Sequence, residues 1–277
     1  MGNYLCGGTS SEQEEEKRSG FYSIQDSYNS IEEVQLALRK VGLESSDLIL
    51  GIDFTKSNTW TGERSFGGKC LHDTCTLQPN PYQRVISIVG RTLEAFDDDK
   101  MIPAYGFGDA FTKDKSCFPF YPDERPCHGF QEALERYNEI APGIQLAGPT
   151  NFGPVIRKAI ETVRAEMSYH ILVIVADGQV TNQKDTEAAI IEASHYPISI
   201  IVVGVGDGPW EQMEEFDDNL PQRVFDNFQF VPYDRVMQNI PPGASAEATF
   251  ACAALMEIPE QFRLVKQLGY LGRIENV

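Results

Sequence analysis

Basic residues are scarce in this sequence of 277 residues. Its 23 lysines and arginines stand against 41 aspartates and glutamates, which gives a formal net charge of −18. A surface this acidic repels nucleic-acid phosphates, and it repels anionic lipid headgroups unless cations bridge the two. We therefore expect no nucleic-acid partner. Divalent metal ions and basic protein surfaces are the natural counterparts, although solubility alone is a second explanation of the charge.

Cysteines are also few, and none belongs to a C-x-x-C pair, the spacing most typical of structural zinc sites. They are too sparse for a disulfide scaffold, no secretory segment precedes them, and no apolar run approaches the roughly 20 residues that span a bilayer. We therefore expect a cytoplasmic protein with free thiols. The residues for which we expect ordinary loop or core roles in place of zinc binding are Cys70, His72, Cys75, Cys117, Cys127 and His128.

The residue sets typical of enzymes are missing as well. Residues 62–70 approximate a phosphate-binding P-loop, but the lysine comes one residue late and Cys70 replaces the magnesium-binding Ser or Thr. The glycines of residues 204–208 lack the full dinucleotide-binding spacing and predict a tight turn instead. No G-x-S-x-G nucleophile elbow occurs, and no histidine is arranged with a nucleophile. We therefore expect a protein that is not an enzyme.

The pattern of the chain predicts a polar arm followed by one folded domain. Residues 1–28 are acidic and lack apolar periodicity, which is typical of disorder, and residues 29–277 form the domain. Ser30, with Glu33 three positions later, predicts a capped helix start, and Gly42 predicts its end. The predicted strands are residues 48–52, 102–107, 171–176, 198–205 and 228–232. The other predicted helices are residues 81–96, 130–140, 154–167 and 186–194, and two within 244–269 broken near Pro259.

Apolar strands without polar interruption are buried on both faces, and here they alternate with helices. This pattern predicts an α/β fold with a doubly wound, mostly parallel sheet of about six strands. We expect one short antiparallel edge strand near residues 117–120. The Gly- and Thr-rich residues 54–80 form a long loop after the first strand, where open α/β sheets bind ligands.

Carboxylates and hydroxyls recur at the predicted strand ends. The first strand runs into a D-x-T-x-S pattern, in which alternate side chains aim Asp53, Thr55 and Ser57 toward one point. Thr150 adds a third hydroxyl in a loop before a helix, and Asp177 adds a second carboxylate at another strand end. A few carboxylates with neutral hydroxyls leave room for water and suit a hard cation such as Mg²⁺.

This set resembles the metal-ion-dependent adhesion site of von Willebrand factor A domains. In that family the hydroxyls bind the metal directly, the aspartates act largely through water, and one position stays open for an acidic side chain of a protein partner. The resemblance implies a Mg²⁺ site, with Mn²⁺ or Ca²⁺ as alternatives, formed by Asp53, Thr55, Ser57, Thr150 and Asp177. Thr55 stands where serine is commoner, but it keeps the hydroxyl.

A wider resemblance is carried by short segments in the same order and spacing: residues 53–55, 80–82, 106–109, 120–122, 148–150, 176–181, 203–210, 216–218, 225–230 and 254–259. They are similar to copines, and most similar to the plant RING-domain ubiquitin ligases whose main body is a copine-type A domain. The similarity covers roughly residues 30–275. It implies an adaptor or scaffold in signalling or membrane trafficking. The alternative is a substrate-binding or regulatory member of the ligase family that works with ubiquitin-ligase components.

Two modules of those relatives are not expected here. Copines carry two C2 domains before the A domain, and an arm of residues 1–28 is too short for one. The plant ligases end in a RING, a zinc module that needs C-x-x-C pairs, and none is present. We therefore expect neither C2-driven lipid binding nor ligase activity by the chain alone.

The N-terminus resembles a lipidation signal. Removal of Met1 exposes Gly2, as in N-myristoylation sites, although Cys6 stands where Ser or Thr is preferred. Cys6 is itself a palmitoylation candidate, and two acyl chains anchor a protein far more stably than one. The pattern predicts association with the plasma membrane through the arm, and a Met-Gly start without meaning is the alternative.

Overall fold

The computed structural model describes residues 29–43, 46–93, 96–97, 99–178, 180–220 and 222–272. The predicted arm, including Gly2 and Cys6, lies outside these residues. The core is a six-stranded sheet with the order β4-β3-β1-β6-β7-β8. The strands of this sheet are β1 (Asp47–Asp53), β3 (Ala104–Phe107), β4 (Cys117–Pro119), β6 (His170–Ala176), β7 (Ile198–Gly204) and β8 (Phe228–Pro232).

Neighbouring strands run parallel except at one edge, where β4 pairs antiparallel with β3. The apolar runs explain this arrangement, because successive side chains of β1 alternate between two cores. Leu48 and Leu50 belong to one core and Ile49 to the other. The predicted doubly wound, mostly parallel sheet with a short antiparallel edge strand is confirmed.

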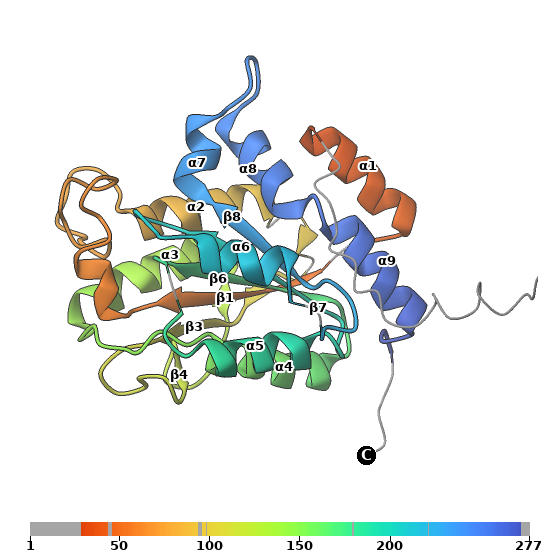
Figure 1. Cartoon of the computed structure of the whole chain (residues 1–277), viewed down its shortest axis with the longest axis horizontal. Helices are drawn as coiled ribbons and strands as arrows, with labels where there is room; N and C mark the ends of the chain where they lie inside the picture. Colours follow the sequence, from red (N-terminus) through yellow and green to blue (C-terminus); the bar gives the residue numbers. More distant parts are fainter. Residues whose placement is uncertain are drawn as a thin grey trace, which may run out of the picture.

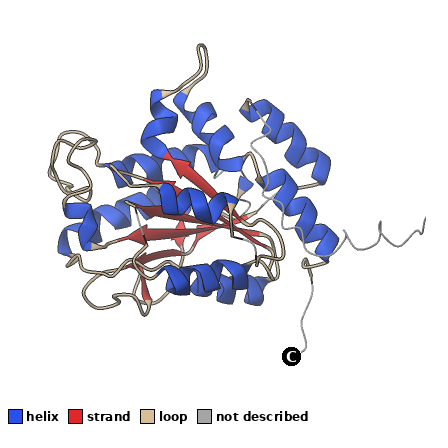
Figure 2. Cartoon of the chain, viewed as in Figure 1, coloured by secondary structure: helices blue, strands red, loops and turns tan. Residues whose placement is uncertain are grey.

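Helices cover both faces of the sheet, and Figures 1 and 2 show the strands between α4 and α5 on one side and α2 and α8 on the other. One core contains side chains of α4 (Gly153–Glu166), α5 (Gln183–Ala193) and α6 (Glu211–Asp218). The opposite core contains side chains of α1 (Ile31–Val41), α2 (Pro81–Leu93), α3 (Gly129–Ile140), α7 (Tyr233–Gln238), α8 (Ala246–Leu255) and α9 (Ile258–Leu268). Among the described residues, no helix has the length and apolar character needed to cross a bilayer.

Of two sequence predictions about prolines, one is wrong and one is confirmed. The strand predicted at 102–107 is divided at Pro103, which has no N–H to donate. Residues before it form β2 (Met101–Ile102), which pairs with β5 (Cys127–His128) in a separate two-stranded sheet. The predicted pair of C-terminal helices with a break near Pro259 is confirmed, since α8 ends at Leu255 and α9 begins at Ile258. Pro259 itself lies in the first turn of α9, where a proline costs no intrahelical hydrogen bond.

Candidate metal centre

The two predicted aspartates lie at the ends of neighbouring strands. Asp53 is the last residue of β1, and Asp177 directly follows β6. The two strands are parallel, with Ile52 opposite Val175, so both carboxylates lie where the two strands end. Both are buried. Burial raises the pKa of the Asp53 carboxyl well above its ordinary value, and the charge of Asp177 raises it further. Burial also raises the pKa of Asp177.

Side-chain contacts join Asp53, Thr55, Ser57 and Asp177. The Thr55 backbone N–H donates to Oδ1 of Asp53 at 2.8 Å. The hydroxyl oxygens of Thr55 and Ser57 lie 2.8 Å apart, and the Ser57 hydroxyl donates to Oδ1 of Asp177 at 3.0 Å. Thr55 has an extended backbone just before the short 3₁₀ helix η1 (Lys56–Thr59), so its loop turns both hydroxyls toward the strand ends. Residues 120 positions apart therefore meet in one polar cluster.

Thr150 lies between the two aspartate loops. The N–H of Lys56 donates to the carbonyl of Ala147 at 2.7 Å, which fixes the start of the Thr150 loop against the D-x-T-x-S segment. The carbonyl of Thr150 accepts the N–H of Thr181 at 2.9 Å, which fixes the loop to the segment after Asp177. Thr150 is buried at this position. Unlike the other four residues, it is held by backbone contacts.

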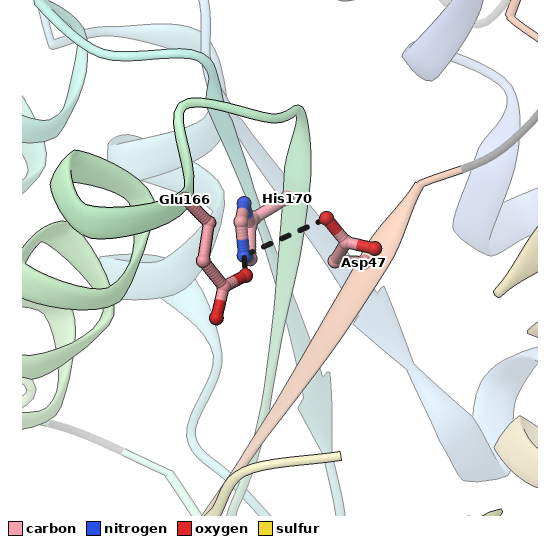
Figure 3. Close-up of side chains that lie close together, drawn as sticks. All are labelled: Asp47, Glu166 and His170. Carbon is pink, nitrogen blue, oxygen red and sulfur yellow. Dashed lines mark hydrogen bonds and ion pairs between the residues drawn. The ribbon is translucent and has the colours of Figure 1, made fainter. Parts of the chain in front are cut away.

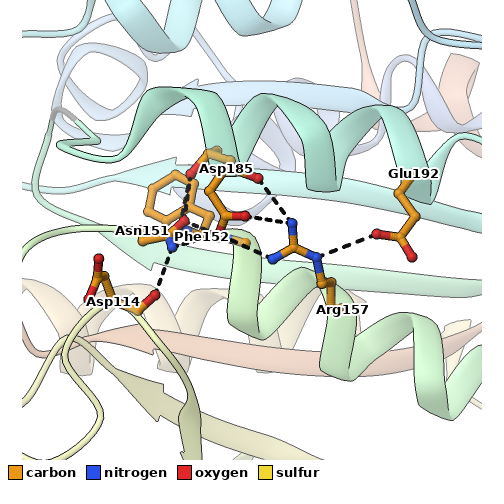
Figure 4. A network of polar contacts seen from close by, with 8 residues as sticks. Asp114, Asn151, Phe152, Arg157, Asp185 and Glu192 are labelled. Atoms are coloured by element: carbon orange, nitrogen blue, oxygen red, sulfur yellow. Dashed lines mark hydrogen bonds and ion pairs between the residues drawn. The ribbon is translucent and has the colours of Figure 1, made fainter.

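The residue after Thr150, Asn151, holds the loop through side-chain contacts (Figure 4). Nδ2 of Asn151 donates to Oδ2 of Asp185 at 2.7 Å and to the carbonyl of Asp114 at 2.9 Å. Arg157 of α4 then holds Asp185 through Nη2 and Oδ1, 2.7 Å apart. These contacts tie the loop to α4, to α5 and to the segment before β4. The position of Thr150 is thus set by rigid elements, as precise ligand geometry requires.

Thr61 is a contributor that sequence reasoning missed. Its hydroxyl donates to Oδ2 of Asp177 at 2.6 Å, so both oxygens of Asp177 accept hydrogen bonds. It is the fourth residue after Ser57, whose carbonyl also accepts its hydroxyl at 3.1 Å. No motif marks it, because its role depends on how the long loop folds back. The only sequence signal was its place in the Thr-rich loop.

His72, which we expected to have an ordinary loop or core role, contacts the backbone of Asp53. Its Nε2 lies 2.8 Å from the carbonyl oxygen of Asp53, which can only accept, so Nε2 donates. Nδ1 then accepts from the Tyr137 hydroxyl at 2.8 Å. Burial lowers the pKa of His72 to about 3, so the ring is neutral, and it stacks between Phe54 and Tyr82 with centroid distances of 4.7 and 4.0 Å. The backbone of Asp53 is therefore held rigidly.

The donor set fits a hard divalent cation. Oδ2 of Asp53 is buried and accepts no hydrogen bond within the described part of the chain. In the part of the chain that the structure describes, neither Asp53 nor Asp177 forms an ion pair with a lysine or arginine, and the largest influences on their pKa values include no basic side chain. Two buried carboxylates without a cation of their own repel each other, and a buried charge is stable only when it is paired. A divalent ion supplies that charge, and hydroxyl and carboxylate oxygens are ligands that Mg²⁺ accepts.

The sheet order, the helices on both faces and the antiparallel edge define a von Willebrand factor A-type fold. The sequence model of the copine family matches residues 70–274. The ligase RGLG1 of Arabidopsis thaliana, an E3 ubiquitin-protein ligase, is 52% identical over 265 residues, which cover 91% of this chain and 54% of RGLG1. Its relative RGLG3 is 52% identical over 259 residues, covering 89% of this chain and 70% of RGLG3. The chain belongs to the copine family.

Two other similarities cover only a small part of the other protein or have low sequence identity. Copine family protein 2 of Caenorhabditis elegans is 53% identical over 247 residues, covering 88% of this chain and 3% of that protein. The chain spans 54–60% of the length of the first plant relatives. The manganese-loaded TRAP protein of Plasmodium vivax is 12% identical with a TM-score of 0.46, covering 72% of this chain and 73% of TRAP.

Proposed function

We propose that this chain is a protein-binding module that depends on a divalent cation. Asp53, Thr55, Ser57, Thr150 and Asp177 hold the ion, Mg²⁺ in the first place with Mn²⁺ or Ca²⁺ as alternatives. When bound, the ion supplies two positive charges and a coordination position for a carboxylate of a protein partner. The side chains of this chain orient the site and exclude water from its floor, and Ser57 is the half-buried member of an otherwise buried set.

One observation carries this proposal: a pair of buried carboxylates surrounded by hydroxyls, which no basic side chain of the described residues pairs with. The two carboxylates balance the charge of a divalent ion, and a coordination position that these residues do not fill is where one more carboxylate binds. The strongly acidic remainder of the chain repels an acidic partner at long range. Capture of such a partner therefore depends on the bound ion.

A pull-down from cell extract with and without EDTA tests the proposal. We expect the wild-type chain to retain partners in Mg²⁺, and to release them in EDTA and after Asp177→Ala. The control is Asp123→Ala, which removes an exposed aspartate elsewhere and should capture partners like the wild type. Partners retained equally by Asp177→Ala, with the fold intact by circular dichroism, would contradict the proposal.

A second candidate function is a role in ubiquitination, which the similarity to RGLG1 and RGLG3 favours. In this version the chain binds substrates or regulates ligase components and has no ligase activity of its own. We expect no ubiquitin chains when it is mixed with purified activating and conjugating enzymes. Metal-dependent chain formation in that mixture would overturn this expectation, and ligase components in the EDTA-sensitive pull-down would favour the second function.

We also propose that membrane association, where it occurs, depends on Gly2 and Cys6. A single acyl chain binds membranes only marginally, so loss of either anchor should release the protein. Gly2→Ala should move the chain from the membrane fraction to the supernatant. A wild-type chain that carries no acyl group by intact-mass analysis and stays in the supernatant contradicts this proposal.

A further inference from the structure

A second cluster of carboxylates lies at the opposite end of β1 from Asp53. Oxygen atoms of Asp47, at the start of β1, and of Asp97 and Asp99 all lie within 4.8 Å of one another. Asp97 is buried with 4% exposure, whereas Asp47 is half-buried and Asp99 is exposed. The cluster is therefore closed on one side and open to water on the other.

Asp97 lacks the partners that a buried carboxylate needs. Neither of its side-chain oxygens accepts a hydrogen bond in the described part of the chain. Over the same residues, no lysine or arginine forms an ion pair with any of the three carboxylates. A buried, unpaired carboxylate between two others is costly unless a cation joins them.

The neighbouring histidine is engaged with other groups (Figure 3). Nδ1 of His170 lies 3.1 Å from the carbonyl of Ser168, and Nε2 lies 2.9 Å from Oε2 of Glu166 and 3.8 Å from Oδ2 of Asp47. Both ring nitrogens face atoms other than those of Asp97 and Asp99, and in the described part of the chain neither of these two carboxylates pairs with the ring.

The other oxygen of Asp47 is available. The Ser168 hydroxyl donates to Oδ2, the same atom that faces His170. Oδ1 accepts no hydrogen bond from any residue that the structure describes, and Figure 3 shows the second oxygen of Asp47 pointing away from the ring. Two contacts therefore fix the carboxylate through Oδ2, while its second oxygen remains free on the outer side.

We propose that Asp47, Asp97 and Asp99 form a second divalent-cation site, and that its ion is Ca²⁺. The donors are all oxygens, and the open side admits the additional waters that complete the six to eight ligands of Ca²⁺. Mg²⁺ demands a stricter octahedral geometry, which fits the hydroxyl-lined centre at Asp53 better. The two sites lie at opposite ends of β1, whose seven residues separate them by about 20 Å.

Calorimetric titration of Ca²⁺ into the Asp177→Asn variant isolates the second site, because that change disables the centre at the other edge. We expect Asp177→Asn to bind Ca²⁺, and we expect the heat to disappear when Asp97→Asn is added. Asp123→Asn, added to the same background, should bind Ca²⁺ unchanged. A lack of Ca²⁺ binding by Asp177→Asn overturns the proposal, and so does equal binding with and without Asp97→Asn.

Asp97→Asn keeps the shape of the side chain and removes a buried charge, so it should fold, and in EDTA it should melt no lower than its parent. If it fails to fold, Asp99→Asn replaces it, because Asp99 is exposed. That variant should weaken Ca²⁺ binding as well, and unchanged binding overturns the proposal. The proposed function is tested separately, since EDTA-sensitive partner capture by the wild type does not depend on which outcome the Asp177→Asn titration gives.

Discussion

Two regions of this molecule contain buried carboxylates, and they differ in what balances the negative charge. Near α6 and β8, Nη1 of Arg223 lies 2.6 Å from Oδ1 of Asp226, and both side chains are almost completely buried. At the ends of β1 and β6, Asp53 and Asp177 are just as buried, but hydroxyls and backbone N–H groups surround them. The first region contains its own cation, and we propose that the second binds one from solution.

This difference distinguishes a carboxylate that stabilises the fold from the two carboxylates that we propose bind an ion. An internal arginine neutralises Asp226 at all times, and the same guanidinium donates to the backbone carbonyl of Asp217 at 2.8 Å, so the region is complete when the chain folds. In the proposed function, the charges of Asp53 and Asp177 are balanced only when an ion binds. A site that exchanges an ion and a partner is not expected to contain a permanent counter-charge.

The largest expected effect comes from removing the buried ion pair between Arg223 and Asp226. Asp226→Ala leaves Arg223 buried without its carboxylate, which should lower the free energy of unfolding by about 3–5 kcal/mol. Urea unfolding followed by circular dichroism measures the loss. It should be the same in Mg²⁺ and in EDTA, and a loss that depends on Mg²⁺ would contradict the separation of the two regions.

The next largest effect is the stabilisation by Mg²⁺. At about a hundredfold excess over its Kd, Mg²⁺ should stabilise the wild type by about 2.7 kcal/mol, because it binds only the folded chain. Differential scanning calorimetry should show a higher Tm in Mg²⁺ than in EDTA. Asp177→Ala and Asp53→Ala should abolish this shift, and Thr150→Ala should reduce it.

The exposed Asp123→Ala serves as the control and should shift like the wild type. Equal Mg²⁺ or Mn²⁺ affinity of Asp177→Ala and the wild type by calorimetry would show that the site is assigned to the wrong residues.

Asp217 provides a test of pH dependence outside both proposed metal sites. Burial raises its pKa to about 8, Asp226 and Asp218 raise it, and the N–H of Phe230 and the charge of Arg223 oppose the rise. The folded state therefore binds more protons than the unfolded state between about pH 4 and pH 8, so this residue lowers stability as pH rises through that window.

The expected slope from Asp217 is roughly 1 kcal/mol per pH unit within the window. Asp217→Asn cannot ionise, so the difference in unfolding free energy between variant and wild type should grow in favour of the variant from pH 5 to pH 8. Urea unfolding at several pH values, in EDTA, gives the difference. A constant difference across this range would mean that Asp217 ionises normally.

The smallest effect should come from Thr61. Thr61→Ala removes the hydrogen bond to Oδ2 of Asp177 without removing a proposed ligand, so the affinity for Mg²⁺ should fall by about tenfold. Thr59→Ala is the matched control, since its exposed hydroxyl donates to the Lys56 carbonyl outside the centre. Calorimetric titration distinguishes them, and equal affinities would show that Thr61 does not position Asp177.

Local patterns predicted much of the fold and the residues of the centre. Apolar runs located the strands of the sheet, since a strand buried on both faces needs no polar positions, and the capping pattern at Ser30 located the start of α1. The D-x-T-x-S pattern and the Asp-Gly after β6 identified Asp53, Thr55, Ser57 and Asp177, which the structure joins by hydrogen bonds. Their role as metal ligands stays a prediction.

The rest depends on contacts between residues far apart in the chain. The sequence by itself determined most of the strands and helices, because periodicity and capping are local properties, but it did not indicate α6, α7 or the pairing of β2 with β5. Only the tertiary structure decided that Thr61 reaches Asp177, that His72 holds the carbonyl of Asp53, and that Asp47 meets Asp97. These contacts form when strand order and loop paths bring distant residues to one edge of the sheet, and no spacing along the chain encodes them.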